Sequence, residues 1–289
     1  MLKARDIRRR IRSVQNTRQI TRTMEMVAAS KLRRAQARVQ GARPYAAKLS
    51  EVVAGLFTPD LAERHPILRQ PESIRKSALV LLTSNRGLAG GFNVNLIRHA
   101  RVTLDELREA GVEVEFHVSG KKGIRFFRFR REPMATERQD ISDRPTMEDA
   151  RSIIDPLLVR FESGELDAVE VVYAQFKSAF STPPARLRIL PVQPTPGPAA
   201  AHARDYIFEP CSEEILTFVL PLYVRNAVYR ALVETAAAEQ GARRTAMKNA
   251  TDNADEMIGT LTLHYNKARQ AQITRELTEI TGGAEALRG

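Results

Sequence analysis

The beginning of the chain carries a pattern of apolar positions typical of a coiled-coil helix. From Ile7 to Leu56 these positions follow one another in alternating steps of four and three residues, and most are apolar. That spacing places them on one seam of a helix, and the many alanines allow a partner helix to approach closely. Pro44 removes one backbone hydrogen bond, so we expect a bend or a loosened turn there without loss of the seam. The seam comprises Ile7, Ile11, Val14, Arg18, Thr21, Glu25, Ala28, Leu32, Ala35, Val39, Ala42, Ala46, Leu49, Val53 and Leu56.

The last part of the chain predicts a second long helix that begins near residues 210–214. Ser212 can cap the first free amides, and the acidic pair after it suits the positive end of a helix. Because glycine disfavours a helix interior by about 1 kcal/mol, Gly282 and Gly283 predict a helix end at Thr281. One apolar stripe comprises positions 224, 228, 231, 238 and 242, and a second comprises Leu263, Ile273, Leu277, Ile280, Ala284 and Leu287. Polar Thr245, Asn249, Asp252 and Glu256 lie between the stripes and indicate contacts outside the chain.

Between the helices the pattern is that of a layered α/β domain. Strands are expected at 78–83, 112–118, 168–176 and 185–190, helices at 93–110 and 146–161, and a proline-rich loop at 191–198. The predicted fold class is therefore α/β, with a long antiparallel coiled coil of the terminal helices and a Rossmann-like α/β/α domain. The expected divisions are an N-terminal helix at 1–57, a globular foot at 75–205 and a C-terminal helix at 212–289.

Helix length predicts how the two terminal helices are used. A helix of about 55 residues spans about 80 Å, and one of about 75 residues spans about 110 Å. Neither length fits inside a domain, so we expect an antiparallel stalk with the C-terminal helix overhanging from roughly residue 270. The apolar positions of that overhang have no partner helix left in the chain, and exposed stripes of this kind mark interfaces.

Charge and composition exclude several classes of protein. The formal net charge is +11, and residues 1–50 alone hold fourteen basic residues against two acidic ones. No apolar run approaches the roughly 18 residues that a membrane helix needs. Cys211 is the only cysteine, which excludes an internal disulfide and a cysteine-based zinc cluster. The basic, acid-poor start is also typical of an organelle transit peptide.

Candidate chemistry is sparse. Gly87, Gly90 and Gly91 lie between an expected strand and helix, but their spacing matches neither a dinucleotide-binding loop nor a P-loop, so a tight turn is favoured. The histidines show neither metal-ligand spacing nor a motif that pairs them with a nucleophile. We therefore expect no catalytic, cofactor or metal site. The histidines are His65, His99, His117, His202 and His264.

Several segments together resemble the gamma subunit of F-type ATP synthases, the central rotor shaft, over essentially the whole chain. They are residues 11–34, Arg43-Pro-Tyr45, residues 83–93, 246–253 and 265–280, and Gly283-Ala284. Two positions depart from the family, because Asn85 and Ala89 stand where it usually has aspartate and cysteine. The family-like residues begin almost at Met1 and the cysteine-bearing insertion of the chloroplast form is missing, so we expect a bacterial protein without a transit peptide.

The resemblance implies a non-catalytic central-stalk rotor subunit that couples ion flow through the membrane to conformational cycling of catalytic subunits during ATP synthesis or hydrolysis. The implied partners are the alpha and beta subunits of the F1 hexamer, the epsilon subunit and the membrane c-ring. Nucleic acid, a small-molecule substrate and a cofactor are not expected. The implied location is the cytoplasmic face of the bacterial inner membrane, as a peripheral protein. The family also suggests that the last helix continues through Gly282 and Gly283.

Individual contact residues follow from the same resemblance. Arg243, Arg269, Gln270 and Thr274 match positions that latch onto the catalytic subunits, and Met24 lies near their acidic lever loop. The basic residues Arg8, Arg9 and Arg12 suit acidic loops on those subunits. Ile273, Leu277 and Ile280 supply apolar contacts, while Tyr206, Phe208 and Glu209 lie in the region expected to meet the membrane ring. For any single residue, the ordinary polarity of an exposed helix face is the alternative.

Two other functions are considered. A strongly basic coiled coil would attract nucleic acid, but only Tyr45 and Phe57 are aromatic in the first helix region and the chain has no tryptophan to stack on bases. A dinucleotide-dependent enzyme could be built on the α/β domain, although the glycine spacing argues against it. Nucleotide binding by the isolated chain would distinguish that enzyme from a rotor.

Overall fold

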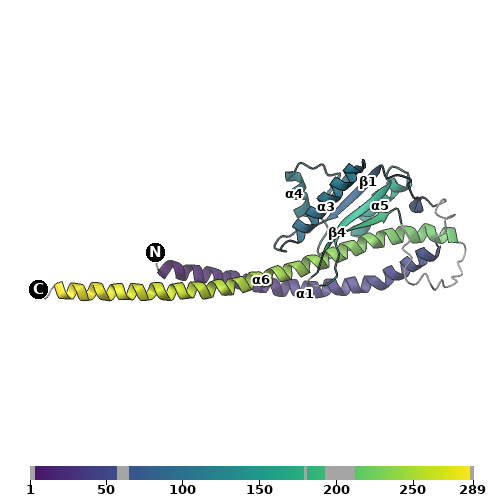
Figure 1. Ribbon diagram of the computed structural model, residues 1–289. Coiled ribbons are helices and arrows are strands. Elements are labelled where there is room, and N and C mark those ends of the chain that lie inside the picture. Colours follow the sequence, from purple (N-terminus) through teal and green to yellow (C-terminus); the bar gives the residue numbers. More distant parts are fainter. Residues whose placement is uncertain (1–3, 57–64, 179–180, 193–211, 287–289) are drawn as a thin grey trace. The chain divides into compact units, whose positions relative to one another are not determined.

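A computed structural model describes residues 4–56, 65–178, 181–192 and 212–286. The predicted strands and domain helices are all present with ends within about two residues of the expected ones. The elements are α1 (Ala4–Leu56), η1 (Pro66–Leu68), β1 (Lys76–Leu82), α3 (Phe92–Glu109), β2 (Glu113–Ser119), α4 (Lys121–Phe129), β3 (Thr136–Arg138), α5 (Met147–Glu162), β4 (Ala168–Ala174), β5 (Pro184–Leu190) and α6 (Ser212–Ala286) (Figure 1).

The strands form one five-stranded sheet in the order β3-β2-β1-β4-β5. Strands β3, β2, β1 and β4 are parallel, and β5 pairs antiparallel with β4. Alternate residues of a strand face opposite sides, so Val80 packs with α5 and the beginning of α6, whereas Leu79 and Leu81 pack with α3 and α4. Helices on both faces of a mostly parallel sheet confirm the predicted Rossmann-like α/β/α fold.

Two compact units make up the chain, and the division between them cuts across both long helices. One unit comprises Met1–Ala28 and Arg244–Gly289, and the other comprises Ala29–Arg243. The cut falls inside the helices because the second part of α1 and the first part of α6 belong to the core of the sheet domain. Leu32 and Val39 of α1 and Ala237 of α6 are buried in the same apolar cluster as α3.

The predicted seam of α1 is confirmed. Every seam position from Ile7 to Val53 is buried or half-buried. Two of its polar members meet polar partners: Thr21 Oγ1 lies 2.8 Å from Thr251 Oγ1, and Arg18 donates to Asp255 over 2.7 Å. Because the α1 numbers rise while those of α6 fall, the two helices pair antiparallel, as expected. Helix α1 is continuous through Pro44.

Helix α6 extends farther than glycine propensity predicts. It runs through Gly282 and Gly283 to Ala286. The end expected at Thr281 is therefore wrong, and the continuation suggested by the family is confirmed. Among the described residues, no helix has an apolar stretch long enough to cross a bilayer.

Candidate partner interface

The C-terminal part of α6 exposes an apolar stripe. All residues from 269 to 284 are exposed. Ile273, Leu277 and Ile280 follow one another in steps of four and three and are 44%, 58% and 68% exposed. That spacing places them on one helix face. The expected exposure of Ile273, Leu277 and Ile280 is confirmed, and Leu287 lies outside the described residues. Exposed apolar stripes of this kind often mark interfaces, so the contact with a partner stays a prediction.

Polar candidates lie on the same part of α6. Arg269, Gln270 and Thr274 are exposed. The Thr274 hydroxyl donates to the backbone carbonyl of Gln270 over 3.0 Å. This bond lies within the helix and does not involve the side-chain amide of Gln270, which can hydrogen-bond to a partner. These side chains are positioned by a regular helix and can contact a partner beside the apolar stripe.

The basic residues near the N-terminus are also on the surface. Arg8, Arg9 and Arg12 are exposed, and within the described parts of the chain none of them forms an ion pair. Met24 is half-buried. The unneutralised guanidinium groups make this end of α1 attractive to an acidic surface.

Arg243 differs from the other candidates because it lies inside the sheet domain. Its side chain is only 9% exposed, and its guanidinium donates to the Glu239 carboxylate over 2.7 Å and to the Gly87 carbonyl over 3.2 Å. The guanidinium is therefore already bound to its own helix and to the β1–α3 turn, and the predicted contact of Arg243 with the catalytic subunits stays a prediction. Helix periodicity cannot reveal this burial, because it does not show that the turn packs against this face.

The carboxyl edge of the sheet is occupied by α6. The Thr235 hydroxyl accepts from the amide of Ala174 over 3.3 Å, and the Glu234 carboxylate accepts from the amide of Phe176 over 3.1 Å. Both amides lie at or just beyond the end of β4, which is next to β1 in the sheet. The helix after β1, α3, covers one face of the sheet, and the helix before β4, α5, covers the other. Doubly wound folds bind nucleotides at that point. In this protein helix side chains take the backbone donors there.

The glycine-containing segment after β1 forms a tight turn, as predicted. Leu88 and Gly90 have positive φ angles of 63° and 56°. The Asn85 side-chain amide donates to the carbonyls of Gln139 and Ile141 over 3.0 and 2.8 Å, and its oxygen accepts from the amide of Lys121. An aspartate, usual in the family, cannot donate the first two bonds. Asn85 thus ties three segments at the carboxyl edge of the sheet.

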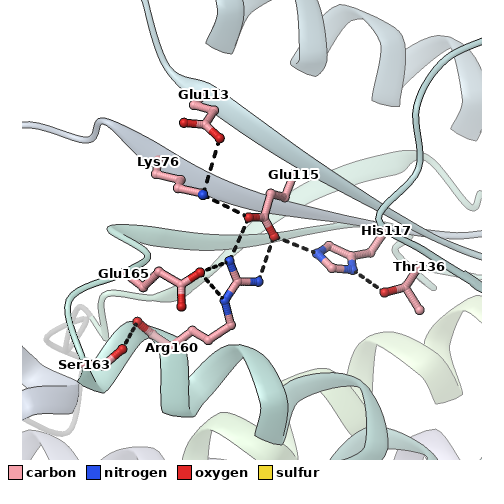
Figure 2. Close-up of polar contacts among 8 residues, drawn as sticks. All are labelled: Lys76, Glu113, Glu115, His117, Thr136, Arg160, Ser163 and Glu165. Atoms are coloured by element: carbon pink, nitrogen blue, oxygen red, sulfur yellow. Dashed lines mark hydrogen bonds and ion pairs between the residues drawn. The ribbon is translucent and has the colours of Figure 1, made fainter.

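Glu115, a carboxyl group with a strongly lowered pKa, lies in a network that contains none of the predicted site residues (Figure 2). Arg160 of α5 donates through two nitrogens to both oxygens of Glu115 on β2, each over 2.7 Å, and Lys76 lies 3.2 Å away. The hydrogen bonds from Arg160 lower the pKa of Glu115 to about 2. Burial lowers the pKa of the neighbouring His117. The network thus joins α5 to the sheet through charged groups.

Sequence reasoning missed this network, although β2 carried a signal for it. Glu113, Glu115 and His117 alternate with less polar residues and so share one face of the strand. Their cation, Arg160, comes from a distant helix and could not be assigned without the tertiary structure. No cluster of potential metal ligands occurs among the residues that the structure describes.

Comparison with known proteins places the chain in a family. Residues 3–287 match the family described as ATP synthase. The ATP synthase gamma chain of Gemmatimonas aurantiaca is 54% identical, with 100% of both chains covered, and that of Moorella thermoacetica is 48% identical, again with 100% of both covered.

Two solved structures share the fold. A chain of the Euglena gracilis mitochondrial ATP synthase, in a structure of OSCP, F1 and c-ring, has a TM-score of 0.65 at 20% identity and covers 98% of this chain and 94% of its own. A chain from the central stalk and c-ring of the Tetrahymena thermophila enzyme has a TM-score of 0.60 at 24% identity, with 80% and 99% covered. The full-length match to bacterial sequences shows that this chain belongs to the ATP synthase gamma chain family.

Proposed function

We propose that this chain is the non-catalytic central-stalk rotor subunit of a proton-driven F-type ATP synthase. The main support is the 54% sequence identity, over the full length, to the ATP synthase gamma chain of Gemmatimonas aurantiaca. The exposed stripe at the end of a 75-residue helix supports it, because a shaft needs a surface that reaches its partners. The proposed partners are the alpha and beta subunits of the F1 hexamer, the epsilon subunit and the membrane c-ring.

The rotor acts by touching three identical catalytic subunits differently. A binder shifts a conformational equilibrium only by its differential affinity for the two states. Reversing a 1:99 population takes about 5.5 kcal/mol. Burial of Ile273, Leu277 and Ile280 contributes about 1.5–3 kcal/mol per side chain, so the stripe supplies a free energy of that order when one catalytic subunit covers it.

Polar contacts add direction to this apolar contact. Arg269, Gln270 and Thr274 lie beside the stripe and would hydrogen-bond to the same catalytic subunit. At the other end of the chain, Arg8, Arg9 and Arg12 would face acidic loops, with Met24 near them. Charge pairs of this kind favour one register and raise the rate of association. The orientation of the shaft would then determine which catalytic subunit binds, releases or converts nucleotide.

The membrane end of the mechanism rests on the family resemblance. The proposed foot residues Tyr206, Phe208 and Glu209 lie outside the described residues. We place the chain as a peripheral subunit on the cytoplasmic face of the bacterial inner membrane, turned by the c-ring. Torque applied to the sheet domain would pass into the long helices through the core that they share with it.

ATP chemistry would take place on partner subunits. This assignment is supported by α6, whose Glu234 and Thr235 occupy the position where a doubly wound fold binds nucleotide. A dinucleotide-dependent enzyme would need that space. Equilibrium dialysis of the isolated chain with labelled ATP and NAD would decide between the two functions, since a rotor binds neither.

The first test is purification of the tagged full-length chain from its native membranes, in moderate salt and with nuclease. Mass spectrometry would identify the proteins that accompany it. Stoichiometric recovery of the ATPase subunits is the expected result. Recovery of nucleic-acid-binding proteins alone, or of no partner, would contradict the rotor assignment.

A further inference from the structure

Helix α4 presents a basic surface that the rotor function does not use. Residues 121–131 contain six lysines and arginines and no acidic residue. The helix buries Ile124 and Phe127 in the core and turns its opposite face outward. Phe129 on that outer side is 85% exposed. We call the following set the α4 patch: Lys121, Arg125, Phe129, Arg130 and Arg131.

The charges of the α4 patch have no ion-pair partner among the described residues. Arg128, the neighbouring arginine on the same face, pairs with Glu137 and is therefore left out of the patch. In the described ranges, no ion pair involves Lys121, Arg125, Arg130 or Arg131. Lys121, Arg125 and Phe129 follow one another in steps of four, so the exposed ring lies along the same edge of the helix as two of the cations.

The backbone at Arg131 adds an independent observation. Helices α3, α4 and α5 all end with the same pair of backbone hydrogen bonds, which requires a left-handed residue after the helix. Gly111 and Gly164 occupy that position after α3 and α5, with φ angles of 76° and 79°, whereas Arg131 occupies it after α4 with φ of 55°. Glycine adopts this conformation without strain and arginine does not. Arginine at this position therefore carries a conformational cost that glycine would avoid, and it adds an exposed cation at the end of the helix.

We propose that the α4 patch binds the surface of a bilayer that contains anionic lipids. The four free cations would lie on lipid phosphates, and the Phe129 ring would enter the boundary between headgroups and acyl chains. Basic residues beside an exposed aromatic ring are the combination that favours such an interface. Lys121, Arg125 and Phe129 share one edge of the helix, and Arg130 and Arg131 follow at its exposed end, so a deformable surface suits the patch better than a rigid pocket.

Nucleic acid fits the α4 patch less well. Binding of single strands relies on several aromatic rings on which successive bases stack. In this helix Phe127 is buried and Phe126 is half-buried against Phe127 in an edge-to-face contact, so only Phe129 offers a free ring. A free phosphate ion would use the cations but would gain nothing from the exposed phenyl ring. The bilayer uses both parts of the patch.

The test is sedimentation of the full-length chain with vesicles of equimolar phosphatidylcholine and phosphatidylglycerol, compared with pure phosphatidylcholine. Only the anionic vesicles should bind, and binding should weaken as salt is raised. The variant Arg125→Glu/Arg130→Glu/Arg131→Glu should bind anionic vesicles more than about a hundredfold more weakly. Removing each cation costs about fivefold in the partition coefficient, and reversing its charge costs more. Phe129→Ser should lose about fivefold.

A matched control separates the patch from overall charge. Arg33, Arg34 and Arg43 of α1 are exposed and have no ion pair in the described part of the chain. Their triple reversal to glutamate changes the net charge equally and should leave vesicle binding near that of the unmodified chain. Equal loss in both triple variants, or equal binding to neutral vesicles, would overturn the proposal.

Arg131→Gly distinguishes a binding role from a structural one. Removing the strain should raise the thermal unfolding midpoint, while vesicle binding should fall about fivefold. A lower midpoint, or unchanged binding, would contradict the role given to Arg131. Full displacement of the vesicles by inorganic phosphate or by single-stranded RNA, with Phe129→Ser binding normally, would assign the patch to those ligands instead. The assay needs no other subunit, so its result is independent of the proposed rotor function.

Discussion

Two parts of the same helix, α6, have opposite environments. Residues 231–241 are buried on every side, although they include charged and polar residues such as Glu234, Glu239 and Gln240. Residues 269–284 are exposed on every side, although they include Ile273 and Leu277. From polarity alone, Glu234, Glu239 and Gln240 would be expected on the surface, and Ile273 and Leu277 would be expected in the interior.

The difference shows that available partners, rather than side-chain type, decide burial along a long helix. In the buried part, the edge of a sheet offers backbone donors that a carboxylate and a hydroxyl can satisfy, which removes the cost of burying polar groups. In the exposed part, none of the residues that the structure describes covers the apolar groups. A stripe without a partner inside the protein is then available for one outside it.

The largest effect should come from deleting the exposed part. Removal of residues 270–289 should weaken affinity for the alpha–beta hexamer by about 4 kcal/mol, because three apolar contacts are lost. The thermal unfolding midpoint of the remaining chain should not change. Assembly and proton pumping in membrane vesicles measure the first effect, and calorimetry measures the second. Normal assembly and pumping by the truncated chain would contradict the interface.

A substitution at Arg243, a buried residue two positions beyond the buried part, should act on folding instead. Arg243→Met should lower the free energy of unfolding by about 3 kcal/mol, because it leaves the Glu239 carboxylate buried without its cation. Burial already raises the pKa of Glu239. Denaturant titration of the full chain provides the measurement.

Two further variants make the Arg243 prediction specific. The exposed Arg269→Met should change the unfolding free energy by less than about 0.5 kcal/mol. Adding Glu239→Gln to Arg243→Met should recover part of the loss, since the orphaned charge is removed. If Arg243→Met and Arg269→Met lowered the free energy of unfolding equally, the predicted difference between the two positions on α6 would be wrong.

Charge reversal at the exposed N-terminal arginines should have a smaller effect. Arg8→Glu/Arg9→Glu/Arg12→Glu should lower the coupled ATPase rate of the assembled complex several-fold, because attraction to acidic loops becomes repulsion. The variant Arg8→Lys/Arg9→Lys/Arg12→Lys keeps the positive charges and serves as the control. If the glutamate variant leaves the rate unchanged, these residues belong to a solvated helix face and do not contact acidic loops.

The smallest effect should appear in the sheet domain at low pH. Glu115 has a pKa of about 2 against an ordinary value of 4.5, so the folded state disfavours its protonation. It therefore contributes stability above pH 4.5, and that contribution is lost as the pH falls toward 2. Because Glu115 keeps some contact with solvent, we expect only about 1 kcal/mol.

Thermal unfolding as a function of pH tests this contribution. Glu115→Gln should lower the unfolding midpoint at pH 7 and should reduce the change in the midpoint between pH 4.5 and 2. An acid response identical to that of the unmodified chain would show that Glu115 contributes nothing to the pH dependence.

Local spacing was sufficient to predict the long helices and most of the sheet. The seam of α1 from Ile7 to Val53 and the strands β1, β2, β4 and β5 follow from periodic burial, which acts between near neighbours in the sequence. Helix α4 and strand β3 were not predicted. Helix α4 is only nine residues long, and the three residues of β3 become a strand only by pairing with β2.

The sequence by itself determined the long helices, α3, α5, four of the strands, the exposed apolar stripe and the family, because these depend on spacing and residue identity along the chain. Only the tertiary structure decided that Arg243 is buried, that α6 occupies the carboxyl edge of the sheet and that Arg160 reaches Glu115. Each of these contacts joins residues far apart in the sequence. Packing between distant elements sets them, and no local pattern records which elements will meet.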